Sequence, residues 1–134
     1  NELNAIQDIV TALASIREAY PEDPLVVVGL GKTGLLTLFA ASIYGGADRV
    51  IADLDGMDPG YDREILSLLP VTSLRRLGDF RSAVLLLAAR KLDLVHPGPT
   101  MDRTWLDAKI KALQLADHFR IYSSEADVPF TSLP

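Results

Sequence analysis

The sequence predicts an α/β domain in which a parallel β-sheet of about four strands is packed in three layers with helices. Two observations favour this fold class. Apolar, β-branched segments alternate with helix-like segments along the 134-residue chain, which is typical of parallel sheets with right-handed helical crossovers. In addition, one stretch reads as a complete strand–turn–helix–turn–strand unit, LVVVGLGKTGLLTLFAASIYGGADRVIADLD, at residues 25–55. The other segments can be placed around this unit.

The first elements are an expected helix and the first strand. Apolar residues recur every three or four positions over 3–20, which indicates a helix. Pro21 and Pro24 end it, because proline cannot continue the hydrogen-bond ladder. Leu25–Val28 is a continuous apolar run without polar alternation. Such a run predicts a strand that is buried on both faces.

Glycines separate the next elements. Leu35–Tyr44 is expected to be a helix, and Gly45 ends it because glycine accepts the left-handed conformation common after a helix. Arg49–Leu54 predicts the second strand. A polar loop through Gly60 follows at the carboxyl end of this strand.

The second half of the chain continues the alternation. The expected elements are short helices at 62–69 and 72–77, a helix at 80–89 capped by Asp79, a strand at 91–96, a helix from Asp102 or Thr104 to about 116, a strand at 119–123 and an irregular end at 125–134. Four strands joined by consecutive crossovers place their helices largely on one face. The first helix, the end of the chain, another domain or another subunit must then cover the other face. We therefore expect either a homo-oligomer or a single α/β domain at 1–134 that is a fragment, or carboxyl-terminal part, of a larger chain.

Net charge, apolar runs and cysteine content exclude some classes of partner and of site. The net charge of −5 disfavours a nucleic-acid partner, which usually requires clustered lysine and arginine. No apolar run approaches the ~20 residues that span a bilayer, so we expect no membrane partner. The chain has no cysteine, which removes disulfides, thiolate metal sites and cysteine nucleophiles.

The turn after the first strand matches the dinucleotide fingerprint G-x-G-x-x-G. Gly29, Gly31 and Gly34 follow a strand and open a helix, and Asp53 lies near the end of the next strand. In that fingerprint the glycines let the backbone approach a pyrophosphate, and the acid binds ribose hydroxyls. This hypothesis predicts an oxidoreductase domain that binds NAD or NADP. A phosphate-binding P-loop is not favoured, because Val26 occupies the place of its first glycine.

The same turn also has the position of a nucleophile elbow, G-x-S-x-G. In that motif a strained strand-to-helix turn lifts a serine above the sheet. The nucleophile position here is Gly31, which has no side chain to attack a carbonyl.

The linear order of segments resembles the carboxyl-terminal part of α/β-hydrolases of the dienelactone-hydrolase and acetyl-xylan-esterase-like type. The resemblance covers about residues 6–123 and rests on three stretches: IQDIVTALASIREAYPEDPLVVVGLGKTGLLTLFAA, GADRVIADLDG and LRRLGDFRSAVLLLAARKLDLVHPG. In the first stretch, G-L-G-K-T-G stands where the family has patterns like G-H-S-K-G-G. The resemblance implies an α/β-hydrolase-like parallel sheet.

The catalytic triad of that family does not carry over to this sequence. The resemblance places its serine at Gly31 and its acid at Asp102, and no histidine follows the fourth strand. The family's proline-containing strand entry is replaced by Arg90 and Leu92, and Asp93 lies within the strand. Losing the nucleophile and the base removes both the covalent step and the proton transfer. The resemblance therefore implies a catalytically inactive domain with a structural, assembly or binding role, no catalytic residue and no cofactor.

The remaining polar candidates favour structural roles. His96 is expected to be a hydrogen-bonded structural residue at the end of the third strand, and His118 a surface residue. Asp53, Asp55 and Asp58 could together hold a cation at the loop after the second strand, but Asp-Gly and Asp-Pro-Gly are common turn sequences. We therefore predict a turn rather than a metal site.

Overall fold

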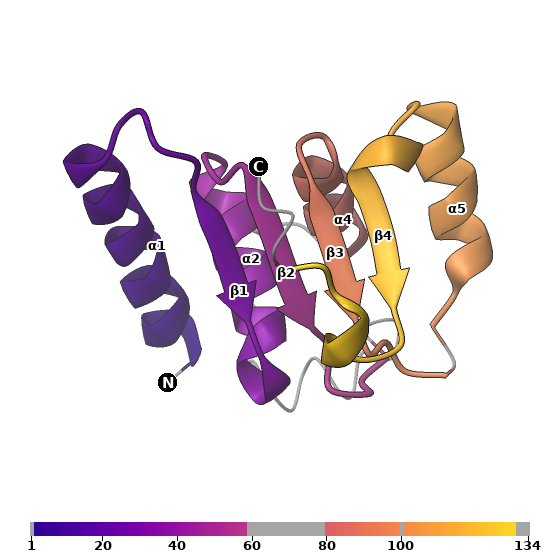
Figure 1. The fold of residues 1–134 in the computed structure, drawn as a ribbon. Coiled ribbons are helices and arrows are strands. Elements are labelled where there is room, and N and C mark those ends of the chain that lie inside the picture. The colour runs from indigo at the N-terminus through magenta and orange to yellow at the C-terminus, as the bar shows by residue number, and fades with distance from the viewer. Residues whose placement is uncertain (1, 59–79, 100, 131–134) are drawn as a thin grey trace.

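The computed structural model describes residues 2–58, 80–99 and 101–130. Helices and strands alternate as Figure 1 shows, which confirms the predicted fold class. The predicted helices at 62–69 and 72–77 lie outside the described residues. The elements are α1 (Glu2–Ala19), β1 (Val26–Gly29), η1 (Gly31–Thr33), α2 (Gly34–Tyr44), β2 (Arg49–Asp53), α4 (Phe80–Ala88), β3 (Leu92–Val95), α5 (Arg103–Ala112), η3 (Ala116–His118), β4 (Phe119–Tyr122) and η4 (Glu125–Asp127).

The sheet is parallel throughout its four described strands. Each strand pairs with the next one in the chain, which gives the spatial order β1-β2-β3-β4. The helices lie behind the sheet in Figure 1, so the crossovers are right-handed. Val27, Val50, Leu92 and Phe119 are register partners across the four strands. Their side chains therefore share one face of the sheet.

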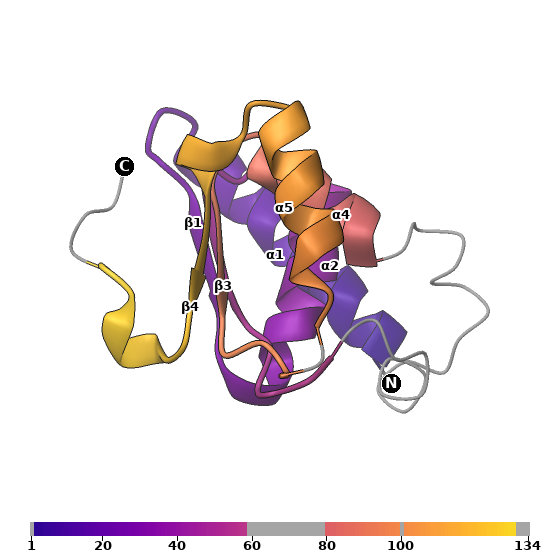
Figure 2. The same cartoon turned by 90° about the vertical axis from the view of Figure 1, so that its right-hand side faces the viewer.

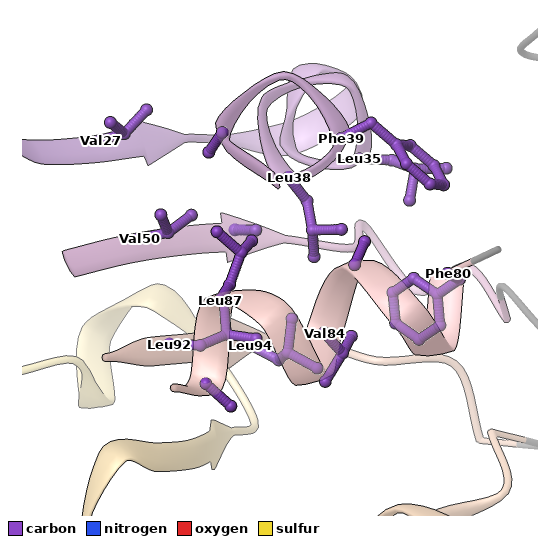
Figure 3. Close-up of a cluster of buried hydrophobic side chains, with 14 of the residues drawn as sticks. Val27, Leu35, Leu38, Phe39, Val50, Phe80, Val84, Leu87, Leu92 and Leu94 are labelled. Carbon is purple, nitrogen blue, oxygen red and sulfur yellow. The ribbon is translucent and has the colours of Figure 1, made fainter. Parts of the chain in front are cut away.

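The helices form one layer against that face. Figure 2 shows α1, α2, α4 and α5 on the same side of the sheet, as consecutive crossovers predict. Figure 3 shows Leu38 of α2 and Leu87 of α4 pointing toward the strands. Leu38 and Val84 are completely buried. Burying one such side chain stabilises the folded state by about 2 kcal/mol. The larger cluster of buried hydrophobic residues lies between this helix layer and the sheet.

The end of α2 confirms the prediction for Gly45. This residue has a φ of +74°, and its N–H donates to the Ala41 carbonyl oxygen at 2.9 Å. Only glycine adopts such a backbone without steric cost. Ala40 and Ala41 are fully buried, and their small side chains let α2 lie close to β2.

The opposite face of the sheet is covered less completely. A small cluster of Ile51, Val95 and Val128 lies there, and η4 lies on this side in Figure 2. The prediction that β1 is buried on both faces was wrong for Val28, whose side chain is 43% exposed. The reason is topological, because β1 is the outer strand of the described sheet. Of the alternatives for covering this face, the first helix does not do so, since α1 lies in the helix layer.

The helix after β3 is shorter than predicted. It ends at Ala112 rather than near 116, because Gln114 adopts a φ of +58° and breaks the helical ladder. The one-turn helix η3 then leads into β4. Among the described helices, none combines the length and the apolar character needed to cross a bilayer.

Candidate functional site

The glycine turn joins β1 to α2 at the carboxyl edge of the sheet. Gly31 has a φ of +56°, in the left-handed region that favours glycine. The Leu30 carbonyl oxygen accepts two hydrogen bonds from Thr33, one from its N–H at 3.2 Å and one from its hydroxyl at 2.8 Å. A Cβ added at Gly31 would meet no described atom within 4 Å. A side chain at this apex would therefore project into open space.

The other two glycines of the turn allow close packing. A Cβ at Gly34 would lie 1.7 Å from the carbonyl oxygen of Asp53, so the first turn of α2 rests directly on the backbone of β2. A Cβ at Gly29 would lie 2.5 Å from the Thr37 side chain. Any side chain at these two positions would push α2 away from the sheet.

Asp53 connects the end of β2 to this turn. Its Oδ2 accepts a hydrogen bond from the Gly31 N–H at 3.0 Å, and its Oδ1 accepts one from the Asp55 N–H at 2.8 Å. The residue is only 4% exposed. Each carboxylate oxygen therefore already holds a backbone donor at a site closed to solvent.

The four residues of the predicted dinucleotide site thus lie together, as the fingerprint requires. Gly34 makes the close helix–strand contact that the third glycine of that fingerprint makes. Asp53 differs from the expected acid, because its carboxylate supports the turn instead of facing an open cleft. Both Asp53 oxygens therefore already accept backbone N–H groups at the place where the fingerprint has an acid for ribose hydroxyls.

The loops after β2 and β3 are bonded to each other at the same edge. The Gly56 N–H donates to the His96 carbonyl oxygen at 2.9 Å, and the His96 N–H donates to the Tyr122 carbonyl oxygen at 2.8 Å. Asp55 and His96 have φ values of +52° and +49°, which are uncommon for residues other than glycine. His96 has an exposed side chain, and its backbone N–H and carbonyl oxygen link the loops after β2 and β3 to β4.

The remaining candidate residues lie outside the glycine turn. Asp102 is the N-cap of α5, where its Oδ1 accepts from the Trp105 N–H at 3.3 Å. Asp58 is buried, and His118 is exposed at the end of η3. Within residues 2–58, 80–99 and 101–130, no group of three or more His, Cys, Asp or Glu residues is arranged to hold a metal ion.

Sequence reasoning missed a buried ion pair on the sheet face opposite the helices. Arg49 donates from Nε and Nη2 to Asp93 Oδ2, both at 2.6 Å, and each side chain is 1% exposed. Arg49 Nη1 has no hydrogen-bond partner among the described residues. The signal was a charged residue in each of two largely apolar strands, Arg49 at the start of β2 and Asp93 within β3, and only the strand register shows that these two charges meet.

A second carboxylate, Asp48, holds the amino edge of the sheet. Its Oδ2 accepts from the Leu25 N–H at 2.7 Å and from Arg17 at 3.0 Å, and its Oδ1 contacts Arg90 at 3.2 Å. The Leu25 N–H, followed by Arg17, lowers the pKa of Asp48 below its ordinary value. Hydrogen bonding to Asp48 raises the pKa of Arg17. This network has a structural role, because Asp48 connects α1, the start of β1 and the residues after α4.

Comparison of the chain with protein-family models, with curated proteins and with solved structures found no significant match. The resemblance to α/β-hydrolases therefore stays a prediction from the sequence.

Proposed function

We propose that this chain is a catalytically inactive α/β-hydrolase-like domain with an assembly or binding role. The observation that carries the proposal is the backbone of Gly31. It stands at the apex of a strand-to-helix turn at the carboxyl edge of a parallel sheet, with a φ of +56° and open space where a side chain would project. In a nucleophile elbow this is the place of the attacking serine.

The other members of a triad support the same proposal. Asp102, which the resemblance matches to the acid, uses its carboxylate to cap α5. The histidines of the chain are His96 and His118, and both precede β4. The family order places the histidine after the last of these strands, where this sequence has none.

The competing proposal is an NAD- or NADP-binding domain that uses Gly29, Gly31, Gly34 and Asp53. The close packing of Gly34 on β2 favours it. Two observations count against it. Asp53 is buried with both oxygens bonded to backbone N–H groups, and the strand order β1-β2-β3-β4 contains no reversal, which is where dinucleotides bind in doubly wound sheets.

Hydrolysis of nitrophenyl acetate tests the inactive turn directly. We expect no turnover above the buffer rate by the unaltered chain. The Gly31→Ser variant should fold, because its side chain meets open space, and it should stay inactive because the base is missing. Gly31→Ala is its matched control. Turnover by the unaltered chain that is lost in His96→Ala or Asp102→Asn would overturn the proposal.

A thermal melt with added NAD or NADP separates the two proposals. A ligand at a hundred times its dissociation constant stabilises the folded state by about 2.7 kcal/mol. We expect no shift in Tm with either dinucleotide. A rise that disappears in Asp53→Asn would establish the competing proposal instead.

A further inference from the structure

The chain after β4 lies on the sheet face opposite the helix layer. Figure 2 shows η4 on that side. We call residues 123–130 the strap; they start directly after Tyr122, where β4 ends. Val128 is 6% exposed and packs in one cluster with Ile51 of β2 and Val95 of β3, which are both completely buried. The strap therefore closes part of this face from solvent.

Val128 is the buried anchor of the strap. The other seven residues of the strap are exposed. The half-buried Val26 and Tyr122 pack beside the small cluster that Val128 joins. The main core lies between the helices and the sheet, and it does not include Ile51, Val95 or Val128. Releasing Val128 thus exposes a small apolar area and leaves the main core intact.

Several hydrogen bonds of the strap join residues of the strap itself. The N–H groups of Asp127, Val128 and Phe130 donate to the carbonyl oxygens of Ser124, Glu125 and Val128, at 3.2, 3.1 and 2.9 Å. The Ser124 hydroxyl also donates to Asp127 Oδ2 at 3.3 Å. Because the donor and the acceptor of each bond lie in the strap, opening breaks none of these bonds. The strap can therefore move as one unit.

Ser123 and Ser124 join the strap to β4. Both residues are exposed, and Ser124 has extended backbone angles, with φ at −149° and ψ at 163°. A few residues at the end of an element, often small ones, commonly absorb the φ and ψ changes of a hinge. Rotation at these two serines lifts the strap and leaves the register of β3 with β4 unchanged, because β4 ends at Tyr122.

The buried ion pair adjoins the residues beneath the strap. Arg49 and Asp93 stand two positions before Ile51 and Val95 in β2 and β3, so all four side chains lie on the same face of the sheet. Arg49 Nη1 has no hydrogen-bond partner among the described residues. A buried donor without an acceptor destabilises the form in which it is shut off from water. Opening the strap lets water approach this face, which favours the open form.

We propose that the strap is a displaceable cover, which opens as a unit about Ser123 and Ser124 when Val128 leaves its contacts. The open strap uncovers Ile51 and Val95, next to the buried ion pair. Such a local opening costs less free energy than global unfolding, because it exposes little buried surface. The strap goes beyond the proposed function, and its opening does not depend on whether the glycine turn binds a ligand.

Thiol labelling of single-cysteine variants tests the strap, because the unaltered chain has no cysteine. Val95→Cys places a thiol beneath Val128, and Val84→Cys places one in the main core; both valines are completely buried. The reagent is DTNB, and each labelling rate is divided by the rate of the same variant unfolded in urea. We expect Val95→Cys to react about tenfold or more faster than Val84→Cys. Below the unfolding transition its rate should change little with urea, because strap opening exposes little surface.

Two further substitutions in the Val95→Cys chain show what holds the strap. Val128→Ala removes part of the anchor and should raise the labelling rate about fivefold or more. Glu125→Ala changes an exposed residue of the same strap and should leave the labelling rate unchanged. If Val95→Cys fails to fold, Ile51→Cys places the thiol at the other residue beneath Val128 for the same measurements.

Three results would overturn the proposal. The first is a labelling rate of Val95→Cys that equals that of Val84→Cys and rises as steeply with urea, since only global unfolding would then expose Val95. The second is the same labelling rate with Val128→Ala as with Glu125→Ala, since Val128 would then not hold the strap. The third is labelling of folded Val95→Cys as fast as in the unfolded chain, since the strap would then not cover Val95.

Discussion

Two aspartates at the ends of β2 each bind a backbone N–H near one end of β1. Comparing them shows two ways in which an edge strand is held in place. At the amino edge, Asp48 accepts from the Leu25 N–H at 2.7 Å. At the carboxyl edge, Asp53 accepts from the Gly31 N–H at 3.0 Å. Each carboxylate thus satisfies a backbone donor that the sheet ladder leaves unpaired.

The surroundings of the two carboxylates differ. The Asp48 side chain is 33% exposed and is paired with Arg17 and Arg90. Asp53 is buried, forms no ion pair within the described residues, and is neutralised by backbone N–H dipoles alone. Solvent reaches the Asp48 side chain and can replace part of what it does, whereas Asp53 is only 4% exposed. The amino edge should therefore tolerate substitution, and the carboxyl edge should not.

The largest expected effect is at the glycines of the carboxyl edge. Gly34→Ala should lower the free energy of unfolding by about 3 kcal/mol or more, because its Cβ would overlap the Asp53 carbonyl oxygen. Gly31→Ala, which meets open space but has a positive φ, should cost only about 1 kcal/mol. Urea denaturation of both variants measures the difference. Equal losses would mean that α2 does not rest on β2 as described.

Asp53→Ala should have the next largest effect. It removes the acceptor of the part-buried N–H groups of Gly31 and Asp55 and leaves a void where the 4% exposed Asp53 side chain packs, at a cost of about 3 kcal/mol in the free energy of unfolding. Asp48→Ala, the matched change at the amino edge, should cost about 1 kcal/mol, since the Asp48 side chain is 33% exposed and water can take part of its place. A larger loss from Asp48→Ala than from Asp53→Ala would reverse the comparison.

Low pH should reduce the stability that Asp48 contributes at the amino edge of the sheet. Its pKa is lower in the folded chain than in the unfolded chain, chiefly because of the Leu25 N–H. The unfolded state therefore takes up a proton first, so the contribution of Asp48 is complete above about pH 4 and is lost as the pH falls through its folded pKa. Unfolding free energies at pH 6 and pH 3 should differ less in Asp48→Asn than in the unaltered chain. An unchanged difference would show that Asp48 is not the group responsible.

The smallest effect is expected for Arg90→Ala. The Arg90 side chain is 55% exposed, and its contact with Asp48 is 3.2 Å. Exposed ion pairs contribute about 0–1 kcal/mol and weaken with added salt. Urea denaturation in low salt and in high salt should show a loss of at most about 0.5 kcal/mol that disappears in high salt. A loss that persists in high salt would mean that Arg90 stabilises the edge by packing rather than by charge.

Local signals in the sequence were enough to predict the fold class and much of the candidate site. The alternation of helix-like and apolar segments predicted the parallel sheet, and the glycine spacing predicted that Gly29, Gly31 and Gly34 form one turn beside Asp53. Gly45 marked the end of α2 correctly. These features depend on backbone conformation and on neighbours in the chain, which the residue types reveal directly.

Contacts between distant segments were decided only by the tertiary structure. The exposure of Val28 follows from the outer position of β1 in the sheet, and the pairing of Arg49 with Asp93 follows from the register of β2 and β3. The carboxylate of Asp53 became a support for the turn because α2 packs directly on β2. Sequence determined which elements form, because propensity and periodicity act over a few residues; the structure decided what each polar group bonds, because that depends on which strands become neighbours.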